Sequence, residues 1–332
     1  MNIAAINKLR IALVVPPALY AFTNFTFTNA AIESTVGATL PQIQAAYTAT
    51  AWTQNTAYLN IGAFQGYQKW TVPSTGFYTI ETGGAAGGGA SAKSHATAYG
   101  SLISGTFYLV SGEFLEIVVG TKGGANGGPY GNENGGGGGT FVKNITNGTL
   151  LAVAGGGGGA SSLNYSGSCI ITPTIGMGQS GLAGGVPSAC ASAAGYSLTT
   201  PTNSNGGNAV GSYMGGAGGG YVSNGANGLT HCAQAFGGKG YTNGLIGGTG
   251  NSCYTTLNYG GFGGGGGGQL GGPGSAGGYT GGSNIGKWAS YANYGGGGGS
   301  YNVGSTQTNT SGGNTGSLGG AAGKGYCKIT KI

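Results

Sequence analysis

Short apolar segments separated by turn residues recur along this chain, some with alternating hydrophobic and polar positions, and this pattern predicts β-strands. The segments span residues 22–28, 69–72, 77–81, 102–110, 114–119, 140–143, 149–154 and 326–332. Residues that favour turns, mainly glycine, proline, serine and asparagine, separate them. The Asn147-Gly148 pair between two segments predicts a hairpin. Short strands with turns at this spacing indicate an all-β sandwich.

A helical pattern occurs at one place, residues 40–47. Thr39 is a suitable N-cap and Pro41 lies in the first turn, where proline is tolerated. Ile43 and Tyr47 are four positions apart and therefore share one face of the helix. We expect very little other α-helix.

Glycine dominates the segment between the last two predicted strands, residues 155–325. It supplies 82 of the 332 residues, without the three-residue repeat of collagen. Hydrophobic residues still make up 39% of the chain, which opposes disorder. A structureless loop of this length is improbable in a compact domain. We therefore predict an ordered insertion of polyproline-II-like helices, which have three residues per turn and bond only to their neighbours.

Charged residues are too few and too scattered for most chemistry. The net charge is +6 and no basic stripe marks a nucleic-acid surface. The chain has no Asp, which excludes a Ser-His-Asp triad. Glu113 and Glu116 fall on opposite faces of a strand and are expected to be solvated. We expect no catalytic residue, cofactor or metal, and so no enzyme.

The five cysteines leave two interpretations open. Cys169 and Cys190, and likewise Cys232 and Cys253, have the same spacing in the chain, which allows two local disulfides with Cys327 left free. Five buried thiols in a reducing compartment are the alternative.

The N-terminal residues 1–21 combine two basic residues with a short apolar run and resemble a signal peptide. The run is broken by Pro16-Pro17 and is too short to span a bilayer. We predict an extended docking arm that packs onto a neighbour through Ile11, Leu13, Val14, Val15, Leu19 and Tyr20. The alternative is a strand packed on its own domain. Residues 22–68 then join the sandwich, 69–154 supply its strands and 326–332 close it.

Tyrosines that interrupt the glycine-rich insertion are candidates for surface contacts with a protein or glycan, because a tyrosine ring offers rigid area and a polar tip. We select Tyr213, Tyr221, Tyr254, Tyr259, Tyr291 and Tyr294. Alternatively, these rings fill the edges of the glycine bundle.

The order of motifs resembles the glycine-rich domain of anaplastic lymphoma kinase-type receptors. The motifs are WTVPSTGFYTIE at 70–81, GGAAGGG at 83–89, NGGGGGTFV at 134–142 and LAVAGGGGG at 151–159. The resemblance implies a jelly-roll sandwich similar to tumour necrosis factor, an inserted bundle of polyglycine-II helices and a homotrimer. The receptors bind their ligand with acidic residues among others. With five Glu and no Asp in this chain, we transfer no binding residue.

Free-standing domains of this kind are similar to glycine-rich structural proteins of bacteriophages and large DNA viruses. We therefore expect a non-enzymatic virion protein at the capsid surface, as a fibre, spike or minor capsid component. Its arm would contact other virion proteins, and its head a host protein or glycan. The alternative is a secreted microbial adhesin or extracellular matrix module. We expect no nucleic-acid partner and no membrane span.

Overall fold

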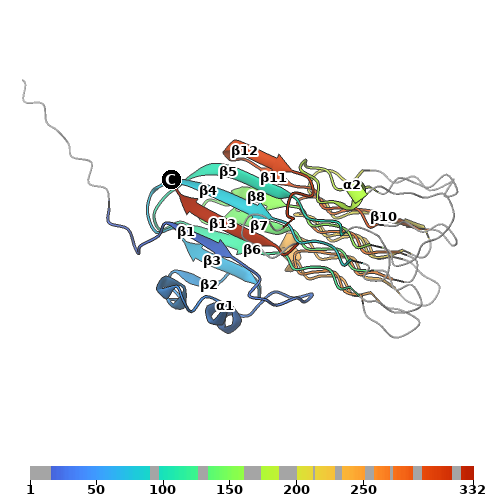
Figure 1. The fold of residues 1–332 in the computed structure, drawn as a ribbon, viewed down its shortest axis with the longest axis horizontal. Helices are drawn as coiled ribbons and strands as arrows, with labels where there is room; N and C mark the ends of the chain where they lie inside the picture. The colour runs from blue at the N-terminus through green and yellow to red at the C-terminus, as the bar shows by residue number, and fades with distance from the viewer. Residues whose placement is uncertain are drawn as a thin grey trace, which may run out of the picture.

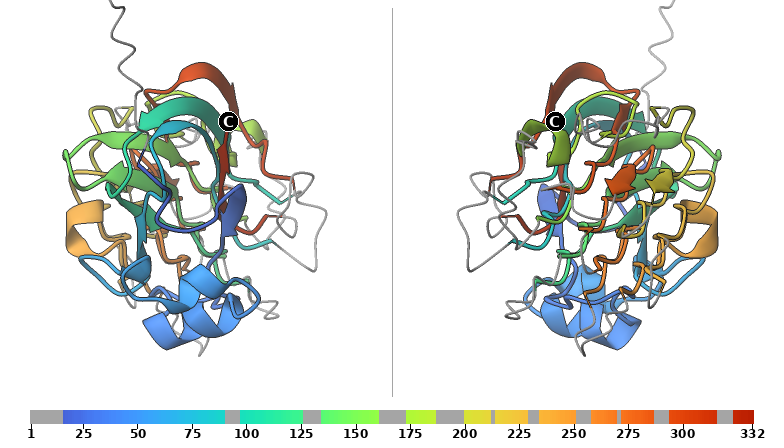
Figure 2. Two further views of the ribbon diagram at one scale, coloured as in Figure 1. Left: turned by 90° about the vertical axis from the view of Figure 1, so that its left-hand side faces the viewer. Right: turned by 90° about the vertical axis from the view of Figure 1, so that its right-hand side faces the viewer.

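The computed structural model describes residues 16–89, 97–125, 134–160, 173–186, 200–211, 214–228, 234–250, 258–269, 272–286, 294–315 and 323–332. Two β-sheets occupy one end of the molecule, and long glycine segments extend from the sheets toward the other end (Figure 1). Figure 2 views the molecule from these two ends. The described residues are mostly β, as predicted. Their helical elements are short: α1 (Leu40–Ala46), α2 (Pro173–Gly176), η1 (Ala51–Gln54) and η3 (Tyr241–Asn243).

One sheet has five strands and the other has six, and within both sheets neighbouring strands are antiparallel. The five-stranded sheet contains, in spatial order, β1 (Asn24–Phe27), β13 (Tyr326–Lys331), β4 (Gly76–Gly83), β5 (Leu102–Leu109) and β12 (Ser305–Thr310). The six-stranded sheet contains β11 (Tyr301–Asn302), β8 (Leu150–Ala154), β7 (Thr140–Asn144), β6 (Phe114–Val118), β3 (Tyr67–Thr71) and β2 (Leu59–Ile61). In the glycine-rich part, β9 (Ala209–Gly211) and β10 (Asn284–Gly286) form a parallel pair.

The main hydrophobic core lies between the two sheets. Inward-facing residues of both sheets meet there, among them Trp70, Ile80, Ile103 and Ile117, all fully buried. Cys327 also lies in this core as a free thiol, and burial raises its pKa well above the ordinary value. A buried neutral thiol of this kind is unreactive. The alternation in the sequence therefore produces an all-β sandwich with one apolar interior.

Most predicted elements are confirmed. The hairpin of β7 and β8 turns at Gly148, whose φ of 80° favours glycine. Helix α1 begins after Thr39, whose backbone N–H donates to the Gln42 side chain (2.8 Å), and it ends just before Tyr47. The side chains of Ile43 and Tyr47 are both buried, as their shared face predicted.

The sandwich also contains strands that the alternation does not reveal. β11 and β12 lie inside the predicted insertion 155–325, yet each extends one sheet at its edge. β12 has the sequence STQTNT and is exposed along its whole length. Both of its faces are polar, so no hydrophobic alternation is needed. The expectation that residues 155–325 lie entirely outside the sandwich is therefore wrong for 301–310.

Candidate functional site: the glycine-rich array and its anchorage

The backbone hydrogen bonds of the glycine segments repeat every three residues. In the run 135–139, N–H groups three positions apart donate to the same neighbouring segment. Gly135 and Gly138 donate to the carbonyls of Gly124 and Thr121, and Gly136 and Gly139 donate to those of Gly266 and Gly263. Gly137 donates to the carbonyl of Gly157 in a third segment. Each turn of this run therefore contacts three other segments, and its N–H groups are satisfied without any side chain.

Two further glycine runs, 155–159 and 295–299, show the same repeat. In the first run, Gly156 and Gly159 donate to the carbonyls of Gly277 and Gly274, and Gly157 and the following Ala160 donate to those of Ala85 and Gly88. In the second run, Gly295 and Gly298 donate to the carbonyls of Gly159 and Gly156, and Gly296 and Gly299 donate to those of Ser283 and Thr280. These bonds join segments that are far apart in the sequence. We call this hydrogen-bonded assembly of the described glycine segments the glycine array.

Close backbone approach explains why the array requires glycine. A Cβ atom at Gly138 would lie 1.7 Å from the carbonyl oxygen of Phe262, and one at Gly157 would lie 1.9 Å from that of Ala98. A side chain at either position would collide with backbone and force the segments apart. Gly181 is different, because nothing lies within 4 Å of its Cβ position.

Aromatic residues anchor the array on the outer face of the six-stranded sheet. They come from points where the glycine-rich chain returns to the sandwich: Tyr221, Tyr241, Phe262 and Tyr279. Their rings form a second apolar cluster with sheet residues, including Tyr67, Val118, Phe141 and Val153. The Tyr67 hydroxyl donates to the Tyr241 carbonyl (2.6 Å). The array is therefore packed against the sandwich and does not extend from it as a free loop.

Glu116 supplies a buried polar anchor on the same face. It lies on β6 between Lys69 and Lys143 of the neighbouring strands and is only 3% exposed. Its carboxylate accepts hydrogen bonds from the Ala63 N–H (2.9 Å) and from the Tyr241 hydroxyl. The expectation that Glu116 is solvated is therefore wrong. Tyr241 covers this strand face from a distant part of the chain.

A shallow hollow of about 500 Å³ lies beside this carboxylate and is lined by Lys69, Lys143 and Tyr241, among others. The Lys143 ammonium is 5.4 Å from the centre of the Tyr241 ring, and that of Lys69 is 4.5 Å from the Phe114 ring. Such cation–π contacts hold the lysines against the sheet. Among the described residues, no group of three His, Cys, Asp or Glu side chains is placed to share a metal ion. Both oxygens of the Glu116 carboxylate accept hydrogen bonds, so this side chain is held between the sheet and Tyr241.

We expect Tyr241→Phe to lower the free energy of unfolding by about 1–3 kcal/mol, because the buried Glu116 carboxylate loses a donor. Tyr108→Phe is the control, since this exposed hydroxyl should change stability by less than about 0.5 kcal/mol. Urea unfolding of the two variants gives both values. Equal stabilities would show that the Tyr241–Glu116 bond does not anchor the array.

Buried tyrosines make the fold sensitive to alkali. Burial raises the pKa values of Tyr67, Tyr241 and Tyr326 well above their ordinary value of 10.0, and nearby glutamates raise them further. Because the pKa values of these tyrosines are raised in the folded state, their neutral side chains stabilise the fold fully below pH 10. This stabilisation is lost as the pH rises above 10. Above pH 10, each of these tyrosines lowers the free energy of unfolding by about 1.4 kcal/mol per pH unit.

We therefore expect the free energy of unfolding to fall steeply above pH 10. Urea titrations at several pH values, together with tyrosine absorbance, measure this loss. Tyrosines that all ionise near pH 10 in the folded protein would contradict the buried network.

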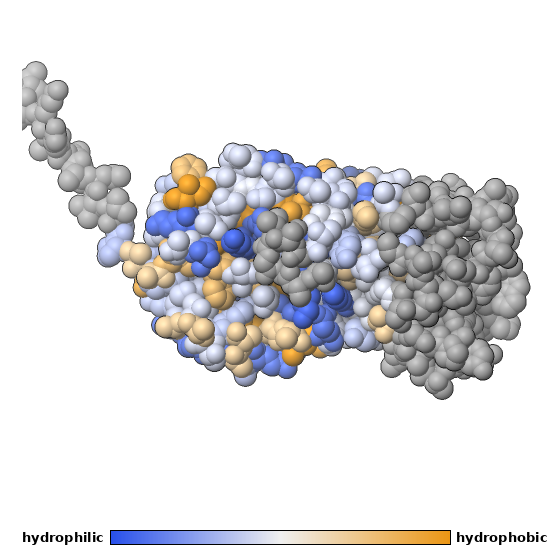
Figure 3. Space-filling model, viewed as in Figure 1, coloured by the Kyte–Doolittle hydropathy of each residue, from blue (hydrophilic) through white to orange (hydrophobic). Residues whose placement is uncertain are grey.

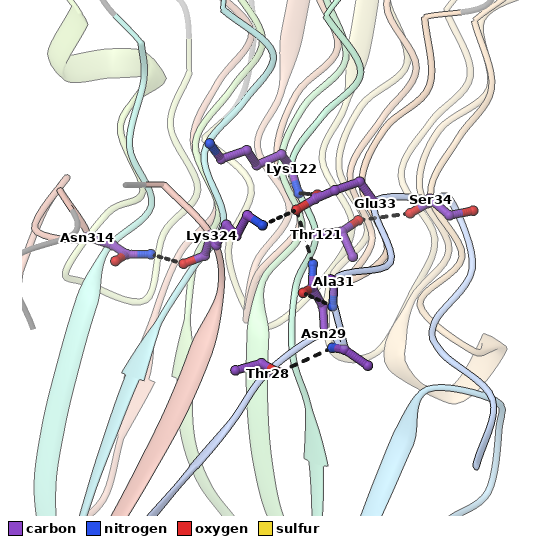
Figure 4. A network of polar contacts seen from close by, with 10 residues as sticks. Thr28, Asn29, Ala31, Glu33, Ser34, Thr121, Lys122, Asn314 and Lys324 are labelled. Atoms are coloured by element: carbon purple, nitrogen blue, oxygen red, sulfur yellow. Dashed lines mark hydrogen bonds and ion pairs between the residues drawn. The ribbon is translucent and has the colours of Figure 1, made fainter. Parts of the chain in front are cut away.

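An N-terminal strap, residues 28–37, fastens the array to the sandwich at their junction (Figure 4). The Glu33 carboxylate accepts hydrogen bonds from the Lys122 N–H (2.9 Å) and the Asn29 side chain (3.3 Å), and it lies 3.9 Å from the Lys324 ammonium. The Ser34 carbonyl accepts hydrogen bonds from the Thr121 hydroxyl (2.8 Å) and from a backbone N–H of the array. The ion pair is partly exposed and contributes little, so the strap acts mainly through its backbone bonds.

The tyrosines selected from the sequence have different surroundings. Tyr221 and Tyr259 are half-buried, and Tyr221 belongs to the anchoring cluster. Tyr294 is only 2% exposed and packs with Ala98 and Ala160, so its selection as a surface contact is wrong. Its ring fills a gap inside the array. Tyr213, Tyr254 and Tyr291 lie outside the described residues.

The predicted docking arm, residues 1–21, does not include Tyr20. The Tyr20 ring stacks on Trp52 (5.1 Å between centroids), and its hydroxyl donates to the Thr71 carbonyl (2.5 Å). Tyr20 therefore packs on its own domain, whereas Leu19 is exposed. The remaining arm residues, Ile11, Leu13, Val14 and Val15, lie outside the described residues, as do Cys169, Cys190, Cys232 and Cys253.

The anchors Phe262, Glu116 and Glu33 were not found from the sequence. The aromatic residues of the second cluster recur at nearly regular intervals in the glycine-rich part, and this recurrence is a signal that could have revealed them. Nothing comparable marks the two glutamates, because their partners are distant in the chain.

Comparison with known proteins gives a partial similarity. No protein-family model matches the chain. A stretch of 76 residues, 22% of the chain, is 38% identical to the leukocyte tyrosine kinase receptor of Mus musculus. The match covers 9% of that receptor, so the chain corresponds to a small part of its length. The similarity gives limited support to the resemblance to receptors of this type. No described helix is long and apolar enough to cross a membrane.

Proposed function

We propose that this chain is a non-enzymatic structural protein that presents a rigid glycine-rich head, and that it serves as a fibre, spike or minor capsid component of a virion. The observation that carries the proposal is the three-residue repeat of backbone hydrogen bonds across the array. Glycines whose Cβ positions are blocked by carbonyl groups leave little room for side-chain chemistry. An assembly of this kind suits mechanical presentation better than catalysis.

We also infer that the glycine segments are polyglycine-II helices inserted in a jelly-roll sandwich. A polyproline-II-type helix has three residues per turn and no internal hydrogen bonds, so residues three apart face the same neighbour. The repeat in the runs 135–139, 155–159 and 295–299 supports this conformation. The two antiparallel sheets are compatible with a jelly roll. The resemblance further suggests a homotrimer.

The arrangement of the molecule supports attachment at one end and presentation at the other. The first described residues and the C-terminus lie at the sandwich end, and the array extends in the opposite direction (Figure 1). A protein fixed near its termini would hold the far end of the array away from its support. Residues of the array would then contact a host protein, a glycan or a neighbouring virion protein.

A secreted adhesin or extracellular matrix module is the second candidate. The partial similarity to a receptor favours it, because a receptor presents a binding domain to its surroundings. The same rigid head would serve there without a virus particle. The two candidates differ in where the protein is found.

Immunogold electron microscopy of purified virus particles tests the proposal, with antibody fragments raised against the array. We expect label on an external projection and reduced host attachment when the fragments are bound. Particles that lack the protein, with the protein found in the culture medium, would overturn the virion role in favour of the second candidate.

A further inference from the structure

The outer faces of the two sheets are covered differently. Aromatic turns of the array pack over the six-stranded sheet, whereas outward side chains of β4, β5 and β13 remain accessible in the described part of the chain. Apolar residues gather at the end of the molecule that carries the termini (Figure 3). Phe77, Tyr108 and Ile332 are 54%, 60% and 72% exposed. Large apolar side chains grouped in this way mark an interaction surface.

Direct contacts join these three residues. The Phe77 and Tyr108 rings meet edge to face across β4 and β5 (5.2 Å), and the Ile332 N–H donates to the Phe77 carbonyl (2.9 Å). In the turn that precedes β4, the Pro73 carbonyl accepts hydrogen bonds from the Leu19 N–H (2.8 Å) and the Ser111 hydroxyl (3.2 Å). We call this surface the terminal patch and define it as Leu19, Phe77, Tyr108, Val110 and Ile332, all exposed.

The first described residues lie beside this patch and follow an apolar segment of the sequence. Residues 9–15 read Leu-Arg-Ile-Ala-Leu-Val-Val and directly precede Pro16-Pro17. Residues 16–18 are exposed and run away from the sandwich, whereas Leu19 is hydrogen-bonded to it (Figure 1). Two consecutive prolines hold the backbone extended and oppose an immediate reversal. Pro16-Pro17 therefore leads the described chain away from the terminal patch of its own copy.

We propose that residues 9–15 of one copy cover the terminal patch of a second copy. This inference rests on the proposed role as an assembly protein and names the partner of its arm. Every copy carries one arm and one patch, so the contact is heterologous and repeats from copy to copy. Such contacts close into a ring when the rotation allows it, and a homotrimer is one closed form.

Full-length variants test the exchange by sedimentation velocity at micromolar concentration. The arm variant carries Leu13→Ser and Val15→Ser, and the patch variant carries Phe77→Ser and Tyr108→Ser. The control carries Leu182→Ser and Val222→Ser, two exposed positions outside the patch. Circular dichroism verifies that each variant is folded.

We expect the unmodified chain and the control to form the same oligomer, and the arm and patch variants to sediment as monomers. Mixing the two monomeric variants should give a one-to-one pair of twice the mass, because one retains an intact patch and the other an intact arm. A monomeric unmodified chain, an arm variant that still assembles, or a mixture that stays monomeric would each overturn the exchange. The labelling of virus particles tests the proposed function separately. Label on the particles, together with an unmodified chain that is monomeric in solution, would overturn the arm exchange and leave the virion role standing.

Discussion

Gly138→Ala is expected to lower the free energy of unfolding by about 3 kcal/mol or more. A methyl group at this position would meet the Phe262 carbonyl, and that carbonyl already accepts a hydrogen bond from the Thr121 N–H (2.9 Å). The new atom cannot fit unless backbone segments separate. Separation breaks bonds on both sides, since Gly138 also accepts a hydrogen bond from the Ala85 N–H (2.9 Å).

Gly181→Ala is the matched control. Its Cβ position is open and its backbone is outside the left-handed region, so alanine should change stability by less than about 0.5 kcal/mol. Urea unfolding of both variants measures the difference. Similar stabilities would mean that the array does not require glycine at its contacts.

Phe262→Ala should destabilise the protein by about 3–5 kcal/mol, the usual cost of removing a buried aromatic ring. Phe262 is buried against Tyr67 (6.3 Å between ring centroids), and its ring also packs against Gly37 and Gly66. Cβ atoms at Gly37 and Gly66 would lie 2.7 Å and 2.6 Å from its ring. The ring therefore joins the strap, the sheet and the array in one contact.

The control for this variant is Phe236→Ala in the same glycine-rich region. Phe236 is exposed, so its truncation should leave the unfolding free energy within about 0.5 kcal/mol of the unmodified value. Thermal unfolding of the two variants compares them directly. Equal losses would argue that Phe262 has no special role in anchorage.

The local sequence pattern was sufficient for β4 and β5, because their buried positions alternate, but it did not reveal the short strand β2. β4 and β5 are predicted within two residues of their ends. Glycine content together with the retained apolar residues was sufficient to predict an ordered insertion. The polar edge strand β12 was missed because neither of its faces enters the core.

The candidate site was less predictable, because its contacts join distant parts of the chain. Glu116 was expected to be solvated, yet Tyr241 covers it from 125 positions away. Tyr294 was expected at the surface, yet it fills space beside two alanines of other segments. Neither partner is visible in the local sequence. The same reason explains why the strap at Glu33 was not anticipated.

The glycine segments are expected to form a fixed, hydrogen-bonded array in solution. Hydrogen–deuterium exchange of the full chain tests it most directly, followed at the amides of 135–139, 155–159 and 295–299. Those N–H groups donate mainly to carbonyls of other segments, so we predict slow exchange comparable with that of β4 and β6. Exchange at the fast rate of an unstructured glycine-rich chain would contradict the account.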